Sequence, residues 1–198
     1  MSNCTGIFQG SNFDCQDPLT VGIVQRVLIA NRQDVKEILY SIVEGEENVI
    51  ESIEMQPDKT FFEFGGVNES IRVQNELLRR SLSNGYKHQL DFIVNEVDNL
   101  SLQNMMAMAY QKQVAIVYGE NESSFGNGAF QMLGVDSGLD LITNVRINGD
   151  VESGGAHQLQ LASPDTGGDE KIIPPVIWST DYGTTLAMIE ALLSPPIP

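Results

Sequence analysis

The sequence predicts an α+β fold that is mainly antiparallel β, with one flanking helix and one C-terminal helix. Most apolar segments are short and either alternate with a period of two or form β-branched runs, and only two segments favour a helix. Their order is strands, one helix, strands and a final helix, rather than the regular alternation that builds a parallel sheet. The expected architecture is an antiparallel β-sandwich or a sheet that can close into a barrel.

Length and composition favour one domain with extensions. The chain has 198 residues, of which 41% are hydrophobic, so it can form a substantial core. Residues 1–20 are rich in Ser, Asn, Asp and Gly and predict an extended N-terminal arm. Residues 21–193 make up the predicted domain. Residues 194–198 follow the last helix as a short tail in which two adjacent prolines prevent further helix.

Three strands are predicted in the first third of the chain. Residues 21–30 are apolar and β-branched, residues 48–56 alternate between apolar and polar side chains, and residues 60–64 form a short aromatic segment. Residues 31–39 predict at most a short helical turn.

A long hairpin is predicted over residues 70–95. Its second half alternates, which places one set of side chains on a common apolar face: Tyr86, His88, Leu90, Phe92 and Val94. Asn84-Gly85 has the sequence of a two-residue hairpin turn. Residues 70–81 are therefore expected to be the first strand.

The second half of the chain begins with the clearest predicted helix, residues 99–112, with Asp98 or Asn99 as its N-cap. Its apolar side chains are expected to share one side: Leu100, Met105, Met106, Met108 and Ala109. Further strands are predicted at 113–118, 129–135, 139–147 and 157–161, with 129–135 and 139–147 paired around Ser137-Gly138. A short extended segment at 174–178 precedes the final helix, residues 184–193, capped by Thr180 or Asp181.

The charge excludes some function classes. Twenty-seven acids against eleven bases give a formal net charge of −16. A protein that binds nucleic acid through its phosphates, or an anionic membrane surface, needs the opposite sign. Acidity suits solubility, and it suits a surface past which DNA must move without adhering.

Chemistry-bearing motifs are scarce. His88 and His157 are the only histidines, and both are expected to be packed or interface side chains rather than bases. No hydrolase, zinc-protease or phosphate-loop motif occurs, so we predict no catalytic residue, cofactor or metal. Residues 165–170 could offer oxygens to a cation but lack a full calcium-loop pattern, so we expect a solvated loop. Cys4 and Cys15 could form a disulfide, although free thiols in a reducing cytoplasm are favoured.

Several stretches carry a resemblance: Asn3-Cys4-Thr5-Gly6, residues 113–118, residues 128–134, the glycine-opened strand at 154–162 and the helix start at 179–186. In these stretches the chain resembles tail-tube and major structural proteins of phages that infect Bacteroidetes hosts, including crAss-like phages. The resemblance covers about 90 residues, as a pattern of strands and turns. It implies a small β-sandwich flanked by a helix, whose copies form rings, usually of six, that stack into a tube with an acidic lumen for DNA.

Charge blocks of opposite sign on successive strands could pair across a subunit boundary, pair within one subunit, or lie on a solvated face. Between residues 44 and 69 there are eight acids and one base, whereas bases dominate between residues 71 and 90. We predict that three acids of the first block line the lumen or its rim: Glu51, Glu54 and Glu63. Strand alternation puts Glu51 and Glu54 on opposite faces unless a bulge intervenes. The candidate inter-subunit residues are the bases and the apolar anchors of the arm: Arg72, Arg79, Arg80, Ile7, Phe8 and Phe13.

The predicted function is therefore structural: a virion protein assembled in the bacterial cytoplasm, with other copies, other tail proteins and passing DNA as its partners. Another ring-forming virion part, such as a tail terminator, neck or baseplate protein, is the nearest alternative. Two alternatives from other classes are a hydrolase that uses a carboxylate pair and a cytoplasmic binding module for a basic partner.

Overall fold

The computed structural model describes residues 23–43, 47–65, 70–79, 84–95, 98–119, 128–147, 155–164 and 169–194. In these ranges the chain forms eleven strands, one 3-10 helix and two α-helices. The strands are β1 (Ile23–Asn31), β2 (Val35–Tyr40), β3 (Val49–Met55), β4 (Phe62–Gly65), β5 (Arg72–Arg79), β6 (Asn84–Val94), β7 (Gln113–Gly119), β8 (Phe130–Leu133), β9 (Asp140–Arg146), β10 (His157–Ala162) and β11 (Val176–Ile177). The helices are η1 (Arg32–Asp34), α1 (Asn99–Tyr110) and α2 (Tyr182–Ala191).

The strands form two open sheets. The central sheet has the order β2-β3-β11-β8-β7-β1-β4, and the outer sheet has the order β5-β6-β10-β9. The pairs within both sheets are antiparallel except β11 with β3, which is parallel. In the described ranges neither sheet closes into a barrel. The predicted class, α+β and mainly β with a flanking and a C-terminal helix, is confirmed.

The central sheet is covered on both faces, which explains its most apolar strand. Residues 113–118 of β7 are all buried, as expected for a strand with packing on both sides. Ile116 and Leu28 contribute to a core that includes Ile189 and Leu192 of the α2 region. Side chains of the opposite face, such as Val117, pack in a second core shared with the outer sheet and α1.

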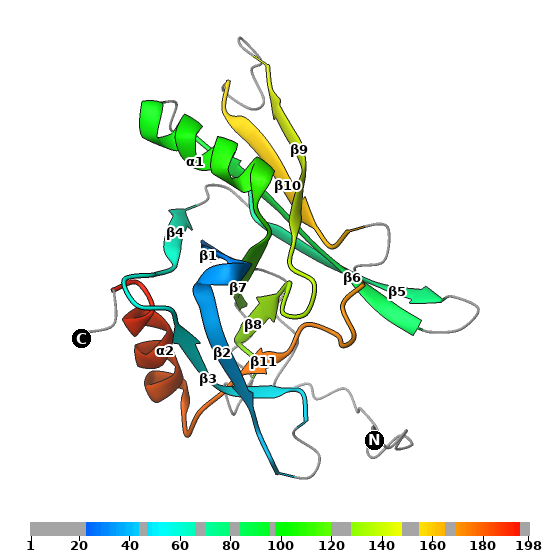
Figure 1. Cartoon of the computed structure of the whole chain (residues 1–198), viewed down its shortest axis with the longest axis vertical. Coiled ribbons are helices and arrows are strands. Elements are labelled where there is room, and N and C mark those ends of the chain that lie inside the picture. The colour runs from blue at the N-terminus through cyan, green and yellow to red at the C-terminus, as the bar shows by residue number, and fades with distance from the viewer. Residues whose placement is uncertain are drawn as a thin grey trace, which may run out of the picture.

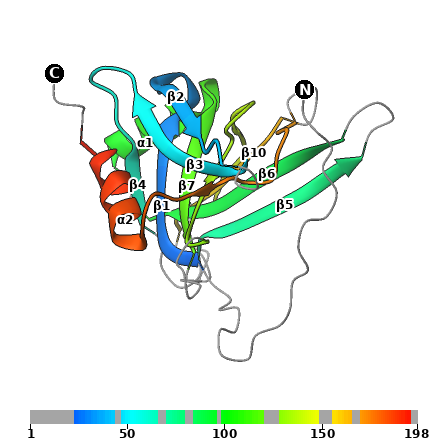
Figure 2. The same cartoon turned by 90° about the horizontal axis from the view of Figure 1, so that it is seen from below.

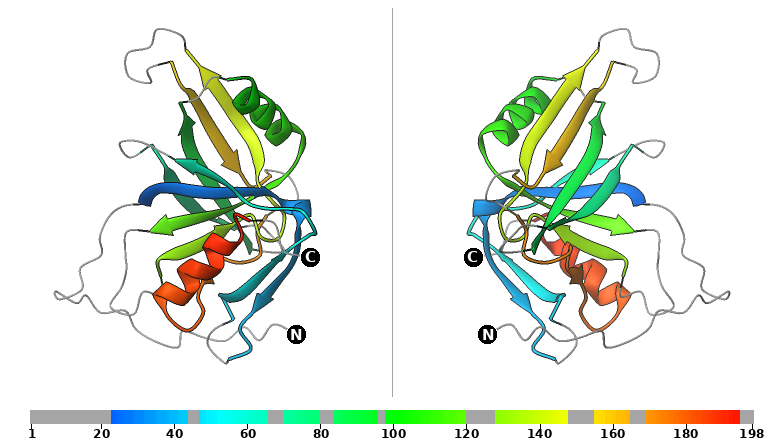
Figure 3. Two further views of the ribbon diagram at one scale, coloured as in Figure 1. Left: turned by 90° about the vertical axis from the view of Figure 1, so that its left-hand side faces the viewer. Right: turned by 90° about the vertical axis from the view of Figure 1, so that its right-hand side faces the viewer.

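The arrangement of these layers is visible in three views. Figure 1 shows α1 beside β9 and β10, with α2 at the other end of the molecule beside β3. Seen from below, the β5–β6 hairpin extends away from the sandwich on the side opposite α2 (Figure 2). The β9–β10 pair likewise extends beyond the central sheet, with α1 along its side (Figure 3). The outer sheet is therefore longer than the layer on which it packs.

The predicted hairpin is confirmed, but its turn lies elsewhere. Arg79 pairs with Asn84 and Leu78 with Gly85, so Asn84-Gly85 belongs to β6 and the connection is residues 80–83. Gly85 is needed for a different reason: a Cβ there would lie 2.5 Å from Cβ of Asp169. The glycine allows a neighbouring segment to approach, and Tyr86 forms a β-bridge with Glu170.

The predicted pairing of 129–135 with 139–147 is wrong. Strand β8 pairs with β7 and β11 in the central sheet, whereas β9 pairs with β10 in the outer sheet. The chain crosses between the sheets through a turn in which Gly134 and Gly138 have φ values of 72° and 75°. Glycine adopts this left-handed backbone without strain, and the turn joins sheets rather than making a hairpin.

Both α-helices begin where an aspartate caps them. The Asp98 carboxylate accepts a hydrogen bond from the Ser101 N–H at 2.7 Å, and the Asp181 carboxylate accepts one from the Thr184 N–H at 3.0 Å. In α1 the predicted single apolar side is wrong in part. Met105 and Met108 are buried, but Leu100, Met106 and Ala109 are exposed.

The segment predicted as at most a helical turn contains η1 and also a whole strand, β2. Its register with β3 shifts, because Leu39 pairs with Ser52 while Tyr40 pairs with Ile50. Glu51 is the extra residue of this bulge. As a result Glu51 and Glu54 are both exposed, although unbroken alternation would separate them.

Candidate assembly interface

One face of the outer sheet has no layer of described residues packed on it. Directly paired residues of antiparallel strands point to the same face. One row across all four strands is Arg72, Asp91, Gln160 and Thr143. The rows on either side are Gln74, Gln89, Ala162 and Asp140, and then Ile93, Gln158 and Val145. Ala162 is buried at the end of β10, so the uncovered part of the face consists of the other residues. We call this set the bare face.

The bare face is mostly polar and rich in amides, and it carries one base, Arg72, against two acids, Asp91 and Asp140. Gln160 donates to Asp91 Oδ1 at 2.9 Å, and Gln89 donates to both Asp91 carboxylate oxygens at 3.2 Å. Arg72 lies directly across β5–β6 from Asp91, and the next charged pair, Glu76 with Lys87, is also of opposite sign. The face therefore presents hydrogen-bonding groups without an excess of basic side chains that could bind DNA phosphates.

Within the described part of the chain, the outer sheet has an open edge at each end. Strand β5 ends the sheet on one side and β9 on the other. Because the three successive pairs are antiparallel, β5 and β9 run in opposite directions. A β9 placed beside the β5 of another copy would therefore continue the antiparallel pattern. Such a contact joins two different surfaces, so it can repeat from copy to copy.

The backbone groups that β5 offers at its edge can be identified. The His88 N–H donates to Ser163 Oγ at 3.1 Å, and the His88 carbonyl accepts from the Ser163 N–H at 2.9 Å. His88 therefore directs its backbone away from β5. Asn75, which is paired with His88, must direct its own N–H and carbonyl to the open edge, because in such a pair neither residue bonds the other. Neighbouring Gln74 instead bonds β6.

The His88 side chain is fully buried, as expected for a packed side chain rather than a base, and it contacts the segments that contain Gly134 and Ile172. Gly134 N lies 3.3 Å from Nδ1, and Nε2 lies 3.0 Å from the Ile172 carbonyl oxygen. An amide N–H can only donate, so Nδ1 accepts and Nε2 carries the single proton. Burial lowers the His88 pKa to about 4.

Nearby, Glu170 is also fully buried and accepts hydrogen bonds from the Asp136 and Ser137 N–H groups at 2.7 and 3.0 Å. Burial raises its pKa despite these donors. The expectation of a solvated loop is wrong for this residue, and residues 165–168 lie outside the described ranges. Glu170 therefore has a structural role, because its carboxylate stabilises the turn that links the two sheets.

Acid is expected to destabilise the fold through His88. Its pKa is about 4 when folded and 6.5 in the ordinary state, so the stability it contributes is present above 6.5 and is lost as pH falls toward 4. Between about pH 7 and about pH 5 the free energy of unfolding should fall by about 2 kcal/mol from this group. Denaturant titrations should show this slope in the wild type and in His157→Gln, but not in His88→Asn. An unchanged slope in His88→Asn would contradict the assignment.

The three candidate luminal acids all lie in the central sheet. Glu51 and Glu54 are on β3, where Glu54 forms an ion pair with Lys36, and Glu63 is on β4. Glu63 accepts a hydrogen bond from Arg26 at 2.9 Å. Two of the three acids are thus paired within the subunit, and a luminal position for any of them stays a prediction.

The candidate inter-subunit residues divide into two groups. Arg72 and Arg79 lie exposed on β5, the open edge strand of the outer sheet. Arg80 and the arm residues lie outside the described ranges: Ile7, Phe8 and Phe13. The charge pattern thus pointed to residues of β5 but not to β9 or the bare face, and a subunit contact at β5 stays a prediction. Alternation of glutamines at residues 158 and 160 was the available signal for that face.

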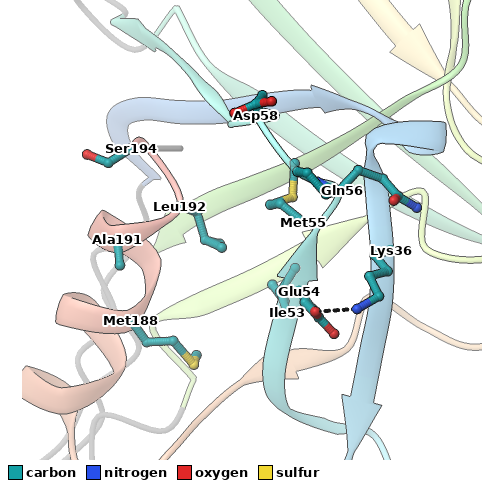
Figure 4. Close-up of a pocket in the computed structure, with 11 residues that line it drawn as sticks. Lys36, Ile53, Glu54, Met55, Gln56, Asp58, Met188, Ala191, Leu192 and Ser194 are labelled. Carbon is teal, nitrogen blue, oxygen red and sulfur yellow. Dashed lines mark hydrogen bonds and ion pairs between the residues drawn. The ribbon is translucent and has the colours of Figure 1, made fainter. Parts of the chain in front are cut away.

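A separate groove of about 700 Å³ lies between β3 and α2. Figure 4 shows Met55 and Ile53 from β3 facing Met188 and Leu192 from the helix side, with the Lys36–Glu54 ion pair on the far wall. These apolar side chains belong to, or pack on, the core beneath α2. The charged residues in the groove's lining are Lys36, Glu54 and Asp58.

Other kinds of site find little support in the described part of the chain. It contains no group of three His, Cys, Asp or Glu residues that could hold a metal ion. Neither described α-helix is long and apolar enough to cross a membrane. No protein-family model, curated protein or solved structure matches this chain.

Proposed function

We propose that the chain is the repeating subunit of a phage tail tube. The observation that carries the proposal is the outer sheet, which combines a bare polar face with two open edges of opposite direction. Joining β9 of each copy to β5 of the next would close several outer sheets into one barrel-like ring. Ring closure would also remove exposed sheet edges, which otherwise invite uncontrolled pairing.

The bare face would line the lumen of such a ring. Its glutamines and paired charges suit a surface along which DNA slides, because they provide no cluster of unpaired bases for phosphate. The net charge of −16 adds like-charge repulsion over the whole subunit. In this arrangement Glu51, Glu54 and Glu63 of the central sheet lie nearer the rim or the outer surface.

The resemblance of residues 113–118, 128–134, 154–162 and 179–186 to tail proteins supports the same function, with rings of six that stack into a tube in the virion tail. A tail terminator, which makes one ring, would use the same two edges. The two roles differ in growth: a tube subunit adds ring upon ring, whereas a terminator stops.

Light scattering across a concentration series tests the proposal. We expect the purified chain to grow from small species to particles whose mass keeps increasing with concentration, because each copy carries both halves of a repeating contact. Growth that stops at one ring would favour the terminator role. A strict monomer at millimolar concentration would contradict both.

A further inference from the structure

A second groove runs along the free edge of the central sheet. Two adjoining cavities, of about 420 and about 80 Å³, lie between β4 and α1 and share Phe62, Phe64 and Asn104 in their walls. Phe62 and Phe64 are two apart on β4, and Leu100, Asn104 and Met108 are four apart on α1. The groove therefore follows one side of a strand and one stripe of a helix.

The walls of this groove carry apolar surface that the subunit does not cover. Phe62 is 61% exposed and Leu100 is 63% exposed, on opposite sides of the groove. The floor is firm, because Phe64 packs edge-on against the buried Phe92 with ring centroids 5.6 Å apart. Large apolar side chains that flank a groove in this way mark a binding surface.

The strand that forms one wall can also bind backbone. Strand β4 ends the central sheet, and among the described residues it pairs with β1 alone. An extended peptide could pair with its open edge and place alternate side chains between Phe62 and Leu100, which is how strand addition combines affinity with specificity. The geometry thus favours an extended segment with bulky apolar side chains over a compact ligand.

Charge narrows the choice of segment. Glu63 and Asp98 line the groove, so an acidic peptide would be repelled. In a chain with twenty-seven acids, residues 2–13 contain none, and they include Ile7, Phe8 and Phe13. We infer that this groove binds the N-terminal arm of a neighbouring copy, an inference that rests on the proposed tube and identifies where the arm docks.

Chain length and connectivity favour a neighbour over the same copy. Phe13 stands ten residues before Ile23, so an extended chain lets it reach about 33 Å from the start of β1. The Gln25 side-chain oxygen accepts hydrogen bonds from Ser70 Oγ at 3.3 Å and from the Ile71 N–H at 3.2 Å, beside the start of β1. Gly65 and Ser70, the described ends of the next connection, thus both lie beside the start of β1. Connections rarely cross at one sheet edge, which favours a neighbour's groove over the arm's own.

Disulfide trapping in the full chain tests this inference, since Cys4 and Cys15 are its only cysteines and both belong to the arm. Gly65→Cys places a thiol at the end of β4, where a Cβ meets nothing within 4 Å. After reduction and mild oxidation at assembly concentration, we expect covalent dimers and longer ladders. Their yield should exceed that of the control by about tenfold, because docking raises the local thiol concentration.

The control variant is Gly128→Cys, because a Cβ at residue 128 also meets no atom within 4 Å. Gly128 precedes Ala129, whose carbonyl accepts from the Gly119 N–H, and Gly119 pairs with Ile23 at the root of the arm. Random encounters should therefore favour the control. Equal yields in the two variants, or a Gly65→Cys product that is a looped monomer, would overturn the inference. Light scattering of the same samples distinguishes the failure of this inference from the failure of the proposed function. Assembly without cross-links would contradict only the docking of the arm in the groove, and cross-linked dimers without larger particles would contradict only the proposed tube. Absence of both cross-links and assembly would contradict both proposals.

Discussion

Asn75→Pro is expected to leave the subunit folded and to prevent its assembly. The Asn75 N–H points to the open edge of β5, because the backbone of its partner His88 is bonded to Ser163 on the other side. Proline is tolerated on an edge strand when the missing N–H faces solvent. The substitution should therefore remove a donor from the proposed contact with β9 and add a ring that blocks its approach. Light scattering should show loss of growth at every concentration at which the wild type assembles.

Gln74→Pro is the matched control, one residue away on the same strand. It removes a hydrogen bond to β6 and should lower the free energy of unfolding by about 1–3 kcal/mol. Thermal unfolding distinguishes the variants, since the Asn75 variant should keep nearly wild-type stability. Assembly by a folded Asn75→Pro protein would show that β5 is not a subunit contact.

Phe92→Ala should have the largest effect on stability of the changes considered. Phe92 is 2% exposed between the two sheets and packs edge-on with Phe64, so its removal leaves a cavity in the core. The expected loss is about 3–5 kcal/mol of unfolding free energy. Chemical denaturation of the variant and the wild type under identical conditions measures it.

Val145→Ala is the control, because Val145 belongs to the bare face and is 44% exposed. A side chain with no layer above it should cost about 1 kcal/mol or less when truncated. Similar losses for the two variants would mean that the bare face is packed against something, and the proposed lumen would then have no surface to occupy.

Local features of the fold could be predicted from the sequence. Alternation identified β6 with the correct buried face, and Asp98 and Asp181 were each one of the two residues predicted as helix caps. These features depend on residues that are close together in the sequence, so their spacing can be read directly from it. The start of β6 was misjudged for the opposite reason: Gly85 is required by contact with Asp169, which is distant in sequence.

Strand order could not be predicted, and the candidate site depends on it. The bare face requires β5, β6, β10 and β9 to be neighbours, although α1, β7 and β8 separate β6 from β9 in the chain. Charge blocks indicated β5 as a contact strand but suggested luminal acids in what is the central sheet. The exposed side of α1 was also missed, because Leu100 and Met106 have the composition of core residues.

Negative-stain electron microscopy of the purified, full-length chain at high concentration is the most direct test of the central claim. The account predicts hollow rings of uniform diameter and, as concentration rises, stacked tubes, and it predicts their absence from Asn75→Pro samples prepared in parallel. Fields of single subunits, or of particles without a central channel, from wild-type protein that remains folded would contradict it.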